Sequence, residues 1–161
     1  MTFKNRMSTI LCLAVSLFVF GCAAQASQMQ DFTLKNLEVQ TINLGTVLKS
    51  HKAVLINFWA TWCPPCREEI PGLIELQKKH GGNAFTILGV DIGESGTKVS
   101  KFVKKIGINY PVVLDADQSV SETNHIVGIP TSFLVSSDGQ ILGEYHAYTP
   151  KLVSDVENAI K

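Results

Sequence analysis

The sequence lacks a surplus of charge of either sign, because its 161 residues contain 14 Lys and Arg against 14 Asp and Glu. Nucleic-acid-binding domains usually carry a basic surplus, so we expect no nucleic-acid partner. Low-complexity segments and internal repeats are also missing from the sequence. With 45% hydrophobic and 17% charged residues, the composition is that of one globular domain and not of a disordered chain.

The sequence also lacks an apolar run of the ~20 residues that a comfortable membrane span needs. The nearest candidate, "MSTILCLAVSLFVF" at residues 7–20, is shorter and follows Lys4 and Arg6. A short positive segment before such a run is typical of an export signal. We therefore interpret residues 1–26 as a signal peptide or lipoprotein signal, and residues 27–161 as a domain that lies outside the cytoplasm.

Two cleavage sites follow this apolar run. "VFGC", which ends at Cys22, resembles the bacterial lipobox, in which the cysteine becomes the lipidated first residue. "AQA" before Ser27 is a small-x-small site for ordinary signal peptidase. An uncleaved anchor is the third outcome. All three predict a periplasmic domain or a membrane-anchored lipoprotein that faces the periplasm.

Cysteine is scarce, with only four in the chain. Cys12 lies in the apolar run and would be removed, and Cys22 would be either lipidated or removed. The mature domain then keeps only Cys63 and Cys66, which excludes a framework of structural disulfides. Because only two residues separate them, these two thiols could hold a metal, attach a haem, or exchange electrons as a disulfide.

Zinc and haem do not fit this cysteine pair. A structural zinc site needs four ligands, usually a second Cys pair or two closely spaced histidines. The histidines do not have that spacing: His51, His80, His125 and His146. Covalent haem attachment needs C-x-x-C-H, and Arg67 occupies the His position. We predict no metal site, although a Cu(I) carrier stays open because two thiolates alone suit that ion.

The local context of the pair favours redox chemistry. "AVLINFWA" at residues 53–60 is a continuous apolar run, typical of a buried central strand. A helical segment follows, with Pro64 and Pro65 in its first turn. Cys63 then lies at a helix N-terminus, where free N–H groups and the helix dipole favour a thiolate. We predict that Cys63 attacks a substrate disulfide and that Cys66 resolves the mixed disulfide.

Strand and helix patterns alternate along the rest of the chain. Strands are predicted at residues 32–36, 37–44, 84–92, 110–117 and, as a hairpin around "SSDG", 131–146. Further helices are predicted at residues 96–108, 118–126 and 149–161. Asp91 and Asp115 end two strands, and we expect them to cap a helix or turn. The order of elements predicts an α/β sandwich around a mixed sheet.

The segment "FWATWCPPCREEIPGL" resembles the active-site segment of the thioredoxin superfamily, and is most similar to the extracytoplasmic TlpA-like branch. Pro71 matches a kink proline that this family carries after its second cysteine. "GIPTSFLVSSDGQI" resembles the segment that bears a cis-proline, here Pro130, and "FVKKIGINYPVVLDAD" resembles the branch's helix–strand insertion. The resemblance covers about residues 31–161. It implies a thioredoxin fold, with a central mixed sheet flanked by helices and a short N-terminal β extension.

The resemblance also assigns expectations to single residues. Glu69 matches an acidic residue of several relatives, and is either a proton acceptor for the second cysteine or a solvated glutamate. Asn57 stands where thioredoxins themselves have a buried Asp, which removes one candidate proton acceptor. Trp62 is expected on the exposed contact rim. A cis bond before Pro130 would leave the backbone of Ile129 free to pair with an extended substrate.

The activity that the resemblance implies is thiol–disulfide exchange without a diffusible cofactor. Most TlpA-like relatives reduce protein disulfides, with electrons from a membrane thiol carrier. The expected client is apocytochrome c, whose C-x-x-C-H thiols must be reduced before haem attaches. A general periplasmic reductase or oxidant and a Cu(I) carrier are the alternatives. A peroxidase of the same superfamily would need a cysteine in a different loop and a further Arg, which the sequence does not clearly supply.

Overall fold

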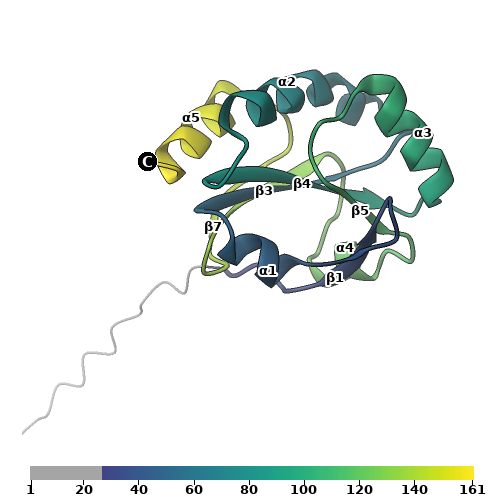
Figure 1. Cartoon of the computed structure of the whole chain (residues 1–161), viewed down its shortest axis with the longest axis horizontal. Coiled ribbons are helices and arrows are strands. Elements are labelled where there is room, and N and C mark those ends of the chain that lie inside the picture. The colour runs from purple at the N-terminus through teal and green to yellow at the C-terminus, as the bar shows by residue number, and fades with distance from the viewer. Residues whose placement is uncertain (1–26) are drawn as a thin grey trace, which may run out of the picture.

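The computed structural model describes residues 27–161, which form an α/β sandwich (Figure 1). The predicted signal peptide and the predicted lipidation at Cys22 lie outside the described residues. Seven strands form one mixed sheet: β1 (Thr33–Asn36), β2 (Thr41–Asn43), β3 (Ala53–Trp59), β4 (Phe85–Ile92), β5 (Val112–Asp115), β6 (Thr131–Ser136) and β7 (Ile141–Tyr145). The helices are α1 (Leu44–Lys49), α2 (Pro64–His80), α3 (Gly96–Ile106), α4 (Ser119–Thr123) and α5 (Pro150–Ala159).

The sheet has the order β2-β1-β5-β4-β3-β6-β7, so β3 and β4 lie near its centre. β3 runs parallel to β4, and β4 runs parallel to β5, whereas β6 is antiparallel to β3. All seven residues of β3 are buried, as its unbroken apolar pattern predicts for a strand with both faces covered. The C-terminal ends of β3, β4 and β5 therefore meet at one edge of the sheet, where β3 leads into the cysteine pair.

Helices cover both faces of the sheet. In Figure 1, α2, α3 and α5 lie over one face, and α1 and α4 lie under the other. The core beneath α2 contains Ile70, Leu73 and Leu76 of that helix, together with Trp59 of β3. Each of these side chains is almost completely buried. The apolar stripe of α2 thus holds the helix that carries both cysteines against the central strands.

The two strands predicted at residues 32–36 and 37–44 are present in shorter form as β1 and β2. β2 is an edge strand, but β1 lies between β2 and β5. The helix α1 was not predicted, because six residues give too short a pattern to establish a period. The side chain of Asn43 caps it by accepting a 3.0 Å hydrogen bond from the Thr46 N–H.

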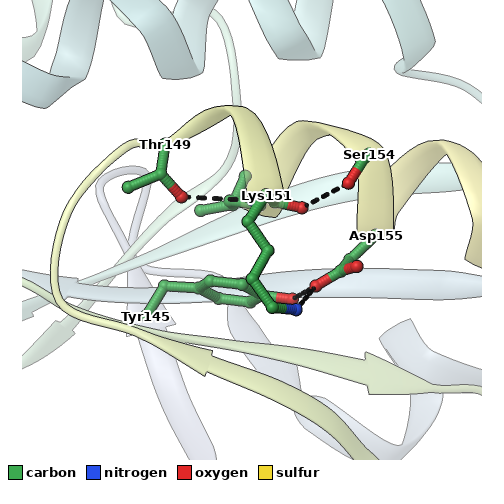
Figure 2. A network of polar contacts seen from close by, with 6 residues as sticks. Tyr145, Thr149, Lys151, Ser154 and Asp155 are labelled. Carbon is green, nitrogen blue, oxygen red and sulfur yellow. Dashed lines mark hydrogen bonds and ion pairs between the residues drawn. The ribbon is translucent and has the colours of Figure 1, made fainter.

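A polar network fixes the C-terminal helix α5 against β7 (Figure 2). The Tyr145 hydroxyl donates a 2.7 Å hydrogen bond to Asp155, and the ammonium group of Lys151 lies 2.5 Å from the same carboxylate oxygen. Thr149 caps the helix by accepting from the Leu152 N–H at 3.2 Å. The helix predicted over residues 149–161 is therefore present, with Thr149 as its N-cap.

The described N-terminal residues lie at the end of the sheet opposite to the cysteines. The Ile141 N–H donates to the Ser27 carbonyl, and the Met29 N–H donates to the Gly139 carbonyl, each at 3.0 Å. These bonds attach residues 27–29 to the β6–β7 hairpin, whose turn lies beyond the N-terminal end of the antiparallel neighbour β3. None of the described helices is both long enough and apolar enough to cross a membrane.

Candidate active site

A disulfide joins Cys63 and Cys66, with 5.3 Å between their Cα atoms. Cys63 is the N-cap of α2, and its Sγ accepts a hydrogen bond from the Cys66 N–H at 3.3 Å. This N–H is among the unpaired donors of the first helical turn, which favour a negative charge on the acceptor. Cys63 is 2% exposed, whereas Cys66 is fully buried. Of the two cysteines, only Cys63 therefore has any exposed surface.

The loop before β6 packs directly against Cys63. The Ile129 carbonyl oxygen lies 3.7 Å from the Cys63 Sγ, and the Ile129–Pro130 peptide bond is cis, as the resemblance implies. Pro130 is buried, while Trp62, which precedes the first cysteine, is 61% exposed. The fold therefore brings together an exposed aromatic side chain, the Cys63 sulfur and a backbone segment 66 residues further along the chain.

Three prolines shape the helix that carries the cysteines. Pro64 and Pro65 are exposed and occupy its first two positions, where a missing N–H costs no helical hydrogen bond. Pro71 lies inside the helix and cannot donate to the Arg67 carbonyl, yet α2 continues to His80. Because Pro64 and Pro65 have no backbone N–H, the first backbone N–H of α2 belongs to Cys66, and it donates to the Cys63 sulfur.

Glu69 is buried one helical turn after the second cysteine. The Asn57 amide donates to its carboxyl at 2.7 Å and to the Ser132 hydroxyl at 2.9 Å. Burial raises the pKa of Glu69 to about 7, although the Asn57 amide and the Tyr148 backbone act in the opposite direction. The interpretation of Glu69 as a solvated glutamate is wrong, because only 7% of the residue is exposed.

The two strand-ending aspartates have different surroundings. Asp115 is a cap, because it accepts hydrogen bonds from the Val120 and Ser121 N–H groups at 3.1 and 2.8 Å. Asp91 was also expected to be a cap, and this expectation is wrong. Both of its carboxyl oxygens are buried, and neither forms a hydrogen bond with any group in residues 27–161. Burial, together with the neighbouring Glu94, raises the pKa of Asp91 to about 8, although the charge of Lys98 acts in the opposite direction.

Sequence reasoning missed the contact between Glu94 and the turn that leads to Cys63. The Glu94 carboxylate accepts hydrogen bonds from the backbone N–H and the hydroxyl of Thr61, at 2.6 and 2.8 Å. No local pattern could have revealed a pair 33 residues apart. Within residues 27–161, no group of three or more His, Cys, Asp or Glu side chains is arranged to hold a metal ion.

Comparison with known proteins agrees with this geometry. The AhpC/TSA family profile matches residues 25–143. The chain belongs to the AhpC/TSA family. Among its relatives in this family is the thiol-disulfide oxidoreductase ResA of Bacillus subtilis, which is 32% identical over 139 residues, 86% of this chain and 76% of ResA. ResA of Geobacillus thermodenitrificans is 34% identical over 118 residues, 73% of this chain and 67% of that protein.

Solved structures of similar proteins share the fold. A thiol:disulfide interchange protein of the thioredoxin family from Chlorobium tepidum superposes with a TM-score of 0.73 at 30% identity, covering 86% of this chain and 99% of that one. StoA from Bacillus subtilis superposes with a TM-score of 0.67 at 25% identity, covering 82% and 98%. The expected thioredoxin fold is therefore confirmed, and the chain is a thiol-disulfide oxidoreductase of the ResA type.

Proposed function

We propose that this chain is an extracytoplasmic protein-disulfide reductase that acts through Cys63 and Cys66. The observation that carries the proposal is the position of Cys63. Its sulfur caps the N-terminus of α2, accepts from the Cys66 N–H at 3.3 Å, and lies 3.7 Å from the Ile129 carbonyl oxygen. A thiolate in that position is stabilised, and an extended substrate can pair with the adjacent backbone.

The proposed reaction transfers two electrons in two exchange steps. The Cys63 thiolate attacks one sulfur of the client disulfide, which forms a mixed disulfide and releases the other client sulfur as a thiolate. Cys66, once deprotonated, attacks the Cys63 sulfur and releases the second client thiolate. The client gains two electrons, and the enzyme is left with the Cys63–Cys66 disulfide that the structure contains.

Glu69 is the proposed proton acceptor for Cys66. The two residues lie three positions apart on α2, so both project from the same side of the helix, and both are buried. A pKa of about 7 for Glu69 suits a group that must take up and release a proton near neutral pH. The Asn57 amide orients this carboxyl through its 2.7 Å hydrogen bond.

The proposed setting is the periplasm, or a membrane surface that faces it. The export signal predicted in residues 1–26 supports this location, with proposed lipidation at Cys22 or cleavage before Ser27. A membrane thiol carrier would then reduce the Cys63–Cys66 disulfide again, and apocytochrome c is the proposed client. Residues 27–29 leave the sheet at the end opposite to the cysteines, so an N-terminal anchor would leave the active site facing away from the membrane.

The reduction potential of the Cys63–Cys66 couple tests this proposal. We would titrate the protein in defined glutathione and dithiothreitol buffers and quantify the free thiols. A potential at or below about −250 mV, similar to that of thioredoxin, is expected of a reductant. A potential near about −120 mV, similar to that of the strong periplasmic oxidant, would instead identify a disulfide donor.

A further inference from the structure

The turn that leads to Cys63 is held by a residue from another part of the chain. Glu94 lies between β4 and α3, and its side chain is only 4% exposed. One carboxylate oxygen accepts from the Thr61 N–H at 2.6 Å, and the other accepts from the Thr61 hydroxyl at 2.8 Å. Both donors of Thr61 are thus satisfied by one ionised group, an arrangement stronger than a neutral hydrogen bond.

Thr61 occupies a position from which it can control the reactive sulfur. It lies in the short turn between the end of β3 at Trp59 and the N-cap at Cys63, and the Cys63 N–H donates to the Ala60 carbonyl at 3.2 Å across the same turn. Thr61 is itself 8% exposed. A displacement of this residue would therefore move Trp62 and Cys63, which follow it directly.

The surroundings of Glu94 maintain its charge and its place. The Lys98 ammonium group lies 2.5 Å from the Glu94 carboxylate, one helical turn further along the chain. Asp91 is also a neighbour of Glu94, and it is fully buried near the end of β4, in register with Trp59 of β3. The pKa of Asp91 is raised to about 8, which favours its neutral form and so reduces its repulsion of the Glu94 carboxylate.

We propose that Glu94 is a positioning residue for thiol–disulfide exchange, which holds Cys63 and Trp62 in the reactive arrangement through its two hydrogen bonds to Thr61. The inference rests on the proposed function and adds to it a group that touches neither the sulfur atoms nor the substrate. These two hydrogen bonds affect the reaction through geometry, since misplacing a reacting group by about 1 Å can reduce a rate by about 100-fold.

The test compares Glu94→Gln with the wild-type full chain in the reduction of a peptide that contains a C-x-x-C-H disulfide. The glutamine keeps the shape but presents an NH2 group to one of the two Thr61 donors, so one hydrogen bond is lost. We expect kcat/KM to fall about tenfold, mostly through kcat, with faster amide hydrogen exchange in residues 61–63. Thr61→Ser keeps both donors and should behave as the wild type, whereas Thr61→Val keeps only the backbone donor and should be impaired.

The pH dependence of Cys63 alkylation separates positioning from charge. Removing a nearby negative charge alone would move the alkylation midpoint to lower pH, because the thiolate is then less destabilised. Loosening the turn should move the midpoint to higher pH, because the sulfur loses its alignment with the helix N-terminus. Glu68→Gln is the matched control, since it removes the same charge from an exposed residue near the cysteines and should leave kcat/KM unchanged.

The inference is overturned if Glu94→Gln has the wild-type kcat/KM and alkylation profile, or if it loses thermal stability alone. Should Glu94→Gln not fold, Thr61→Val decides by the same readouts. A wild-type chain that does not reduce the peptide would count against the proposed function and not against the positioning role of Glu94. In that case, hydrogen exchange in residues 61–63 and the midpoint of Cys63 alkylation would still test whether Glu94 positions Cys63.

Discussion

The side chains of Asn57 and Glu69 form a buried 2.7 Å hydrogen bond between the central strand β3 and the helix that carries both cysteines. The strand thus contributes a neutral amide, and the acidic group comes from α2. The Asn57 amide uses its second N–H to donate to Ser132 on β6, so three elements fix the pair. The arrangement leaves Glu69 as the buried acid nearest in sequence to Cys66.

Cys66→Ser should trap a covalent complex with the client. The serine cannot resolve the mixed disulfide, so the bond between Cys63 and the client should persist on a non-reducing gel and disappear with dithiothreitol. Cys63→Ser is the matched control and should trap much less, because Cys66 is fully buried. Equal trapping by the two variants would contradict the assigned order of attack.

Glu69→Gln should slow the resolution step. The amide keeps the shape of the side chain but cannot accept a proton, and loss of a general base typically costs about 100-fold. The effect should be largest near pH 7 and should shrink at higher pH, where Cys66 ionises without help. Stopped-flow decay of the mixed disulfide measures this rate, and Glu68→Gln serves as the exposed control. Identical decay rates at pH 7 would exclude Glu69 as the proton acceptor.

Asp91→Asn should flatten the pH dependence of stability. The pKa of Asp91 is raised in the folded protein from 3.8 to about 8, so the folded state favours the neutral acid. The stability that this group contributes is therefore complete below about pH 4 and is lost as the pH rises towards 8. We expect the ionisation of Asp91 to lower the free energy of unfolding of the wild type by on the order of 5 kcal/mol across this window.

Urea unfolding at several pH values checks this expectation. The asparagine variant should lose most of the slope, and the remainder should come from Glu69, whose pKa is raised from 4.5 to about 7. Glu69→Gln should remove that remainder. Stability curves of wild type and Asp91→Asn that run parallel over the whole range would show that Asp91 is ionised in the folded protein.

Gly143→Ala should destabilise the attachment of α5 to the sheet. A Cβ atom at Gly143 would lie 2.3 Å from the Tyr145 hydroxyl, which is hydrogen-bonded to Asp155 (Figure 2). Tyr145 is buried, so its ring has little room to move, and we expect a loss of about 2 kcal/mol. Gly128→Ala is the control, because a Cβ atom there meets nothing within 4 Å. Thermal unfolding compares the two, and equal midpoints would contradict the expected clash.

Trp62→Ala should weaken client binding without affecting the fold. The side chain is 61% exposed beside Cys63, so its removal should change the free energy of unfolding by less than about 0.5 kcal/mol. KM for a protein disulfide should rise several-fold, while the rate with a small disulfide such as oxidised glutathione should stay the same. Leu142→Ala is the control, since Leu142 is also an exposed hydrophobic residue but lies on the edge strand β7. An unchanged KM for the protein substrate would show that Trp62 does not contribute to client binding.

Local sequence patterns were sufficient for the cysteine pair and its setting. A continuous apolar strand, two prolines and an amphipathic helix each produce their structure through interactions between near neighbours. The position of Cys63 at a helix N-cap could therefore be predicted before any tertiary contact was known. Resemblance to the thioredoxin superfamily added the cis bond before Pro130, which pattern reasoning alone would have taken to be trans.

Long-range packing decided the chemistry around that pair. Glu69 looks like an exposed first-turn glutamate in the sequence, and Asp91 looks like a cap, yet both are buried with raised pKa values. Glu94 contacts Thr61 only because β4 lies parallel to β3, which brings the loops that follow the two strands to the same edge of the sheet. Burial and hydrogen bonding between distant residues depend on the assembled sheet. For this protein, the sequence by itself determined that the cysteine pair stands at the N-terminus of a helix, and only the tertiary structure decided which buried groups surround that pair.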